Sequence, residues 1–486
     1  MPILLVLLVV LPLLGALTAL AGRTLLTEAV TIVLGVGSFG MALALIPSAA
    51  HGSVELGFLR ADAISVVFLL GTTFLYAATA VYSVGYLRSD SEHAGETRGY
   101  ARRFYVGINL FAWAMMCAPL VNGLALLWVA VEITTVVSAL LVALDRTDSA
   151  AEASWKYVLI ASAGLGLGLL ATIVMYYAGS TALGPSFDLA FEPLFQAGTA
   201  LPHTPVRLAF VLAVLGFGTK VGLFPVHTWL PDAHSEAPTP VSALLSGSLL
   251  AVSFYAILRY YQIASRALGS EFPRTVLLVF GVLSLLLAAL YLIGQRDVKR
   301  LLAYSSVEHM GILAIGVSFG APLAMGGVLL HVMAHAAAKG NAFFGAGVLV
   351  RKYGTKEIGS IRSGLDVLPW TAPLFLFAIL ALSAIPPFGI FRSEFQIVAG
   401  GLSADHRAPA VILIVLVTLA FLGLSIATTR MVYSPGPKPA VRGEPSAWMV
   451  VPMVAGIIVL IVLGLHPGNG ITDLLTHGAA ELGGSA

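Results

Sequence analysis

Lys220 lies within the apolar stretch 208–226, which Pro225 interrupts. An amine at the centre of a membrane-spanning helix costs about 3 kcal/mol on insertion scales. Irregular backbone at that depth is tolerated where it lines a hydrated cavity. The residue type and its position therefore predict a buried ion pathway, most simply one for protons.

Glu132 lies near the middle of a second apolar stretch, 122–144. A pair between Glu132 and Lys220 would explain why both charges are tolerated. The pair could be a static structural contact, or it could load and release a proton, because a nearby carboxylate stabilises the protonated amine. We expect the two side chains to lie together.

His331, His335 and Lys339 repeat every four residues within the stretch 321–351. This spacing places them on one face of a helix. Imidazole exchanges protons near neutral pH and has two nitrogens, so the stripe suits proton relay. Histidines four residues apart can also bind zinc. Since no cysteine or carboxylate falls on the same face, we predict no metal site.

Glu394 follows a second proline break, at Pro386 and Pro387. A carboxylate at the exit end of a broken helix is typical of the terminus of an ion pathway. The alternative is a salt bridge at an interface with another chain.

Three more candidates are expected closer to the membrane surface. Glu308 and His309 are placed one to two turns into the stretch 299–319. They could take up protons from the cytoplasmic side, or they could anchor the end of the helix. His227, just after the first break, is a candidate relay residue.

The composition determines the class of protein that holds these residues. The chain has 486 residues, of which 58% are hydrophobic and 10% charged, whereas soluble proteins carry about 25% charged residues. The one cysteine, Cys117, excludes a cysteine-ligated iron–sulfur cluster and an internal disulfide. No phosphate-binding motif is present, and the net charge of +2 gives no indication of nucleic-acid binding. We predict a polytopic membrane protein with no cofactor and no redox centre of its own.

A membrane-spanning helix needs about 20 apolar residues. The sequence predicts an all-α protein with about fourteen such spans. They are expected at 2–21, 26–46, 62–87, 103–120, 122–144, 154–178, 206–233, 238–262, 274–294, 299–319, 321–351, 370–402, 408–433 and 447–467. Glycines 164, 166 and 168 fall inside one span, so we expect them to allow close helix packing.

Lysine and arginine residues sort strongly by side when the spans are placed in this way. Seventeen fall on one side and six on the other. Because positive charge favours the cytoplasmic side, both termini are predicted on the non-cytoplasmic side of a cell inner (plasma) membrane.

The spans also suggest an internal repeat. Two blocks of five spans each have a proline break in the fourth span, and an odd number of spans inverts the second copy. The predicted organisation is peripheral helices in 1–102, a first repeat in 103–262, an inverted second repeat in 274–433, and a last helix with a short tail in 434–486.

Two segments carry a resemblance to a known family. The segment 218–240, GTKVGLFPVHTWLPDAHSEAPTP, resembles the signature of the antiporter-like subunits of respiratory complex I, Mrp antiporters and membrane-bound NiFe hydrogenases. The segment 299–306, KRLLAYSS, resembles their second shared motif. The resemblance covers roughly 60–465. Within the family, the sequence around Glu308 and Glu394 looks most like the formate-hydrogenlyase branch.

The resemblance implies roles for individual residues. Glu132 resembles the glutamate that partners the lysine of the first broken helix, and Lys220 resembles that lysine. Lys339 or a neighbouring histidine resembles the central relay, and Glu394 the terminal acid. Ala251 departs from the pattern, because many relatives have a lysine there.

An alanine cannot carry a proton, so this departure opens a gap in the expected relay. Ordered water near hydroxyl side chains would have to cover it, or another route would be used. The candidates are Ser246, Ser248, Ser253 and Tyr255.

The main functional hypothesis is a non-redox, proton-translocating subunit of a larger oxidoreductase. Its expected partners are other membrane subunits, a peripheral hydrogenase or dehydrogenase arm, and the lipid bilayer. The alternatives are a Mrp-type Na⁺/H⁺ antiporter subunit in a redox-free complex, a relative that no longer pumps, and one coupled to carbon uptake.

Overall fold

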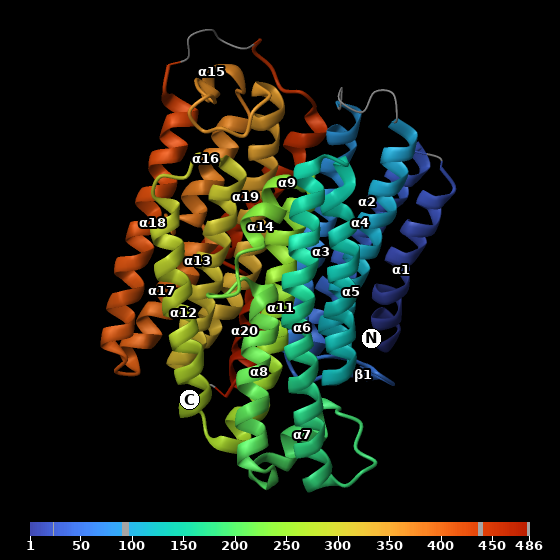
Figure 1. Ribbon diagram of the computed structural model, residues 1–486, viewed down its shortest axis with the longest axis vertical. Helices are drawn as coiled ribbons and strands as arrows, with labels where there is room; N and C mark the ends of the chain where they lie inside the picture. Colours follow the sequence, from blue (N-terminus) through green and yellow to red (C-terminus); the bar gives the residue numbers. More distant parts are fainter. Residues whose placement is uncertain (23, 90–96, 436–440, 484–486) are drawn as a thin grey trace.

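The computed structural model describes residues 1–22, 24–89, 97–435 and 441–483. Long helices run along the longest axis of the molecule (Figure 1). The α15 end of the bundle is uppermost in this view, and the α7 end is lowest. One short antiparallel hairpin, β1 (Val54–Leu56) with β2 (Leu59–Ala61), is added to the expected all-helical fold. Arg23 and Lys438, both counted among the basic residues above, lie outside the described residues.

The helices follow one another along the chain with short connections. They are α1 (Pro2–Leu20), α2 (Thr24–Ala49), α3 (Ala63–Arg88), α4 (Thr97–Leu120), α5 (Leu124–Val142), η1 (Ala143–Asp145), α6 (Asp148–Leu183), α7 (Phe191–Ala197), η2 (Gly198–Ala200), α8 (His203–Val221), α9 (Leu230–Glu236), α10 (Thr239–Leu244), η3 (Leu245–Leu249), α11 (Leu250–Leu268), α12 (Glu271–Leu292), α13 (Val298–Phe319), α14 (Pro322–Tyr353), α15 (Gly364–Val367), α16 (Thr371–Leu382), α17 (Gly389–Ser403), α18 (Arg407–Tyr433), α19 (Ala447–Leu465) and α20 (Asn469–Glu481).

Among the described residues, 11 helical segments are long and apolar enough to cross a membrane. Large apolar side chains such as Leu25, Leu140 and Val33 are exposed on the outside of the bundle, as expected of surfaces that face lipid. Three expected spans fall outside the 11: they correspond to α4, to α14 and to the broken pair α16 and α17. The chain is therefore a multi-span membrane protein.

Both predicted helix breaks are confirmed. The helix α8 ends at Val221, and α9 begins at Leu230 after an irregular stretch that contains Pro225. The helix α16 ends at Leu382, and α17 begins at Gly389. Proline lacks a backbone donor and clashes with the preceding turn, so it disfavours a continuous helix at each place.

The helix α14 is the centre of the second half of the chain. It is buried over nearly its whole length, 324–349, and packs against α3, α13, α16, α17, α19 and α20. A helix that is buried on all sides can hold polar groups away from lipid. This position accounts for the tolerance of charge along α14.

The expected packing role of the glycines is confirmed at two of three positions. A side chain at Gly216 of α8 would collide with the backbone of Gly168 in α6, and one at Gly164 would collide with Thr219. Gly166 faces open space. Gly164 and Gly168 therefore let α6 and α8 approach closely.

The segment after the last expected span is more than the predicted tail, because it forms the helix α20. In this helix Gly478 lies against Leu329 of α14 and Ala63 of α3. Figure 1 shows α20 in the lower half of the bundle. The segment is short and weakly apolar, so its pattern gave no signal of a span.

Candidate functional site

Lys220 lies in the last turn of α8 and is fully buried. Its Nζ donates to Thr135 Oγ1 at 2.8 Å and to the Tyr157 hydroxyl. The same nitrogen lies 4.5 Å from the centre of the Tyr157 ring. Hydroxyl groups and an aromatic face therefore stabilise the amine in an apolar bundle.

Lys220 and Glu132 do not form the predicted direct ion pair, although their charges are close enough to interact. Among the described residues, no ion pair joins them, and Glu132 Oε1 instead accepts from Ser162 at 3.3 Å. Glu132 Oε2 is buried with no partner among these residues. Glu132 lies three residues before Thr135 on α5, about one helical turn away. Its carboxylate is therefore one turn from the hydroxyl that accepts from Lys220. The lysine extends to Thr135 and Tyr157, whose neutral side chains gave no sequence signal.

Two histidines from neighbouring helices are hydrogen-bonded to each other. His309 Nδ1 of α13 lies 3.0 Å from His331 Nε2 of α14. His331 Nδ1 lies 3.0 Å from Ser393 Oγ of α17. This single imidazole thus connects three helices through both of its nitrogens.

His335 and Lys339 continue the predicted stripe along α14, and both are fully buried. The His335 ring lies 5.1 Å from that of His309, centre to centre. Neither His335 nitrogen has a hydrogen-bond partner in the described part of the chain. Lys339 Nζ donates to the Leu302 carbonyl at 3.0 Å and to the Ser305 hydroxyl.

The prediction that Glu308 and His309 are shallow is wrong. Both lie halfway along α13 and are 1% and 0% exposed. Ten residues from the start of a helix is nearly three turns at 3.6 residues per turn, which is deeper than expected. They interact with His331, His335 and Lys339 in a group of buried titratable side chains that we call the central cluster.

Glu394 completes the central cluster from α17. It is buried, and its Oε1 has no hydrogen-bond partner within the described residues. One ligand atom each from Glu394, His309 and His331 can be chosen so that all three lie within 4.8 Å of one another. Three helices, α13, α14 and α17, therefore bring together groups that the sequence separates widely.

Two histidines and a carboxylate could in principle hold a zinc ion. The sequence argument against a metal considered only one helix face, and the fold brings in ligands from two more helices. However, the His309–His331 hydrogen bond joins these two ligands directly. A metal ion would have to replace that bond, whereas proton transfer uses it.

His227 lies apart from Lys220 and from the central cluster. It lies in the break between α8 and α9 and is 7% exposed. Its Nδ1 has no hydrogen-bond partner among the residues described. Within the described residues it has no hydrogen bond to Lys220 or to the central cluster.

A polar cavity of about 670 Å³ opens toward the α15 end of α14. It is lined in part by Asp145, Glu236, Lys299, Arg351 and Lys356. Burial raises the pKa of Glu236, but hydrogen bonding to Lys356 outweighs this and holds that pKa below its ordinary range. Such a cavity can hold water and mobile protons.

The cavity adjoins the helix that holds the central cluster. Lys299, at the start of α13, donates to the Ala237 carbonyl at 2.7 Å. Leu302 and Ser305, which contact Lys339, follow within two turns of the same helix. The cavity is therefore separated from Lys339 by a short length of α13.

The hydroxyl side chains expected to cover the gap at Ala251 are only partly in place. Ser246 Oγ lies 2.7 Å from Ser306 Oγ, beside the residues that contact Lys339. Ser253 Oγ instead donates to the Leu249 carbonyl of its own helix. Side-chain hydrogen bonds therefore extend from the neighbourhood of Lys339 to η3. Among the described residues they do not continue to Lys220.

Residues 121–423 match the family described as NADH:quinone oxidoreductase/Mrp antiporter, TM. The chain is 33% identical over 426 residues to a hydrogenase-4 component F homolog of Methylacidiphilum infernorum, covering 86% of this chain and 88% of that relative. It is 29% identical to NADH-quinone oxidoreductase subunit N of Desulforudis audaxviator, covering 83% and 81%.

A solved structure has the same fold. The match is to a chain of the Mrp complex from Dietzia sp., with a TM-score of 0.84, 22% identity, and coverage of 98% of this chain and 97% of that one. At this identity, the likeness establishes the fold.

Proposed function

The chain belongs to the NADH:quinone oxidoreductase/Mrp antiporter family of membrane subunits, and from this premise we propose that it translocates protons through its buried titratable residues. The pathway comprises Glu132, Lys220, His331, His335, Lys339 and Glu394, with Glu308 and His309 as uptake residues that lie within its core. His227 is a relay beside the first break.

One observation carries the proposal. The central cluster brings His309, His331 and Glu394 together from three helices: the two histidines are hydrogen-bonded at 3.0 Å, and one ligand atom of Glu394 lies within 4.8 Å of both. Each charged group at this depth costs about 3 kcal/mol on insertion. A fold that served only as a scaffold would gain nothing from keeping so many of them together.

In this mechanism protons enter from the polar cavity and follow α13 to Lys339. The amine passes a proton to the His335, His309 and His331 group, which delivers it to Glu394. Lys220 holds a second proton, which is bound more tightly as Glu132 approaches. A change in the position of Glu132, imposed by a neighbouring subunit, would release that proton.

The topology follows from the same premise. We assign fourteen spans, with α4, α14 and the α16–α17 pair crossing in addition to the apolar helices. The blocks 103–262 and 274–433 form inverted repeats, flanked by peripheral helices in 1–102 and by 434–486. The excess of positive charge supports an orientation with the α15 end in the cytoplasm and both termini outside it, in a cell inner (plasma) membrane.

The relatives indicate the kind of assembly. Hydrogenase-4 component F and NADH-quinone oxidoreductase subunit N are each named as one part of a larger complex. We propose that this chain likewise lies beside other membrane subunits, and that a hydrogenase or dehydrogenase arm supplies the driving free energy. It has no redox centre of its own.

The likeness to the Mrp complex favours a second candidate, exchange of Na⁺ for protons in a redox-free assembly. The two candidates differ in their response to sodium. In sealed vesicles, an imposed Na⁺ gradient should drive proton movement through an exchanger. It should leave a redox-driven pump unaffected.

The test of the main proposal uses the native complex in sealed vesicles. Lys220→Ala and Glu394→Gln should each abolish coupled proton movement while the driving reaction continues. Wild-type proton movement in both variants would refute the proposal. Identifying the subunits that co-purify would establish the partner module.

A further inference from the structure

Three side-chain hydrogen bonds join α3 to the antiparallel η3–α11 segment, outside the pathway described above. Ser248 Oγ donates to Thr72 Oγ1 at 2.8 Å, and Ser65 Oγ lies 3.0 Å from the Tyr255 hydroxyl. Arg259 Nη2 donates to Asp62 Oδ1 at 2.6 Å. We call these six residues the α3–α11 seam. It runs from the middle of the bundle to its α7 end.

The inner end of the seam contacts α14 beside the central cluster. A side chain at Gly247 would lie 3.2 Å from the Ala336 carbonyl, and one at Gly71 would lie 3.3 Å from Ala336 Cβ. These glycines directly precede Ser248 and Thr72 in sequence. Ala336 follows His335, whose two nitrogens lack partners in the described part of the chain. The inner end of the seam therefore packs directly against the turn of α14 that carries His335.

The middle of the seam is an interval between two hydrogen-bonded pairs. Ser248 and Tyr255 are seven residues apart, about 10.5 Å along a helix. Ala251, three residues after Ser248 and four before Tyr255, shares their helix face. Its side chain is only a methyl group, and the Phe68 ring nearby packs edge-on to Tyr255.

The outer end is a buried ion pair. Arg259 is fully buried, and its Nη2 donates to both oxygens of Asp62 and to the Tyr255 hydroxyl. Burial raises the pKa of Asp62, but the charge and hydrogen bonds of Arg259 outweigh it and keep that pKa far below its ordinary range. Asp62 is therefore ionised at physiological pH.

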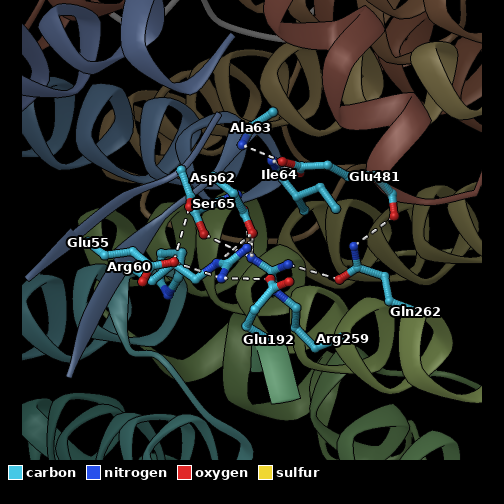
Figure 2. A network of polar contacts seen from close by, with 12 residues as sticks. Glu55, Arg60, Asp62, Ala63, Ile64, Ser65, Glu192, Arg259, Gln262 and Glu481 are labelled. Carbon is cyan, nitrogen blue, oxygen red and sulfur yellow. Dashed lines mark hydrogen bonds and ion pairs between the residues drawn. The ribbon is translucent and has the colours of Figure 1, made fainter. Parts of the chain in front are cut away.

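Glu481, at the end of α20, lies beside this ion pair, next to Ala63 and Ile64 (Figure 2). Its carboxylate accepts from the backbone nitrogens of Ala63 and Ile64 at 3.3 and 3.2 Å. Burial and the Asp62 charge raise the pKa of Glu481 to about 8. Its Oε1 lies 3.7 Å from Nε2 of His477, which is 38% exposed.

We propose that the α3–α11 seam connects His335 to water at the α7 end, with Glu481 as the group that exchanges the proton with solvent. This inference rests on the proposed function and supplies its second opening, opposite the polar cavity. The proton moves from His335 through water to the hydroxyls of the seam, and from there past the ion pair to the Glu481 carboxylate. His477 or bulk water then accepts it.

The other charged groups around Glu481 are consistent with this role. Asp62 from the start of α3 repels a charged carboxylate, and Arg259 from α11 attracts it. Arg266 of α11 interacts with it at longer range, and His477 lies on its own helix. The acid is thus held between two opposed charges, where loss or gain of a proton costs little.

The experiment compares Glu481→Gln with Glu192→Gln in the native complex, in sealed vesicles. Glutamine keeps the shape and an acceptor oxygen but cannot exchange a proton. Glu192, at the same end, is half exposed, pairs with Arg60 at 3.3 Å and is the matched control. We expect Glu481→Gln to slow proton movement at least about tenfold, since an essential transfer group contributes roughly 100-fold or more. The control should be unchanged.

Two further measurements distinguish a role in proton transfer from a purely structural role. The infrared carbonyl band of a protonated carboxyl should titrate near pH 8 in the wild type and disappear in Glu481→Gln. Ala251→Leu should slow proton movement without removing any titratable group, and Ala256→Leu, on the same helix, tests for general damage by a larger side chain.

The seam is refuted if Glu481→Gln and Ala251→Leu both pump at the wild-type rate while Lys220→Ala does not. That outcome leaves the proposed function intact. Normal pumping by Lys220→Ala and Glu394→Gln would instead overturn the proposed function itself. A Glu481 band that does not titrate between pH 6 and pH 10 would also refute the seam, because the acid would then have no role in exchange.

Discussion

His309 Nδ1 and His331 Nε2 lie 3.0 Å apart, on two different helices. At this separation a proton can move between the rings without an intervening water. His331 is in turn bonded to Ser393 on a third helix. These two contacts connect the stripe of titratable residues on α14 to α13 and α17.

Removing this connection should stop proton movement. His331→Asn keeps a hydrogen-bonding side chain but loses the exchangeable ring, so we expect the rate to fall by roughly 100-fold or more. A pH-sensitive dye in vesicles with the native complex would measure it. Ser393→Ala, which removes a partner and not a carrier, should have a smaller effect, and equal effects would contradict the relay role of His331.

The buried ion pair should dominate the stability of the α7 end. Arg259→Met removes the main partner of the buried Asp62 carboxylate and leaves only the longer contact with Arg60 at 3.4 Å, a loss that approaches the cost of a broken buried pair, about 3–5 kcal/mol. The matched control is Arg407→Met, because Arg407 and its partner Asp405 are 82% and 83% exposed. An exposed pair contributes about 0–1 kcal/mol. Thermal unfolding in detergent measures the difference, and similar losses in both variants would contradict the account.

Close packing of α6 against α8 gives a prediction about glycine. Gly216→Ala places a methyl group against the Gly168 backbone, so it should destabilise the protein by about 1–3 kcal/mol. Gly166→Ala points into open space and should be neutral. The same unfolding assay compares the two, and a destabilised Gly166→Ala would show that α6 packs differently.

The attachment of α20 to α3 should depend on pH. The pKa of Glu481 is raised to about 8 in the folded protein, so its contribution to stability is complete below the ordinary carboxyl pKa and is lost as the pH rises through about 8. Hydrogen exchange, corrected for its intrinsic pH dependence, should show weaker protection of α20 above this pH.

Two comparisons check that result. Glu481→Gln should make the protection of α20 independent of pH over this range. The pKa of Asp62 is depressed, so its contribution is present above the ordinary value and is lost only in strong acid. The start of α3 at Ser65 should therefore stay protected where α20 loosens. A drop in protection at both sites together would assign the transition to another group.

Much of the site could be predicted from the sequence because charge in an apolar span is costly. Lys220, Lys339 and Glu394 stand out for that reason, and the proline breaks follow from backbone chemistry. The predicted direct ion pair between Lys220 and Glu132 does not form because the crossing of α5, α6 and α8 decides which group the amine meets. Spacing along one chain contains no information on that crossing.

Other parts of the site gave no usable signal. Thr135, Tyr157 and Ser305 are neutral, and such residues are common in any helix. Asp62 and Arg259 fall near the ends of spans, where charged groups usually face water. Only the packing of α20 against the start of α3 identifies this end of the bundle as buried.

The most direct test of the central claim is the number of protons moved per turn of the driving reaction, measured in sealed vesicles with Lys339→Gln. Lys352→Gln is the control, since Lys352 lies at the solvent end of the same helix and donates to the Gly443 carbonyl. We predict that Lys339→Gln lowers this ratio while the driving reaction continues, and that Lys352→Gln leaves it unchanged. An unchanged ratio in Lys339→Gln would contradict proton conduction through this subunit.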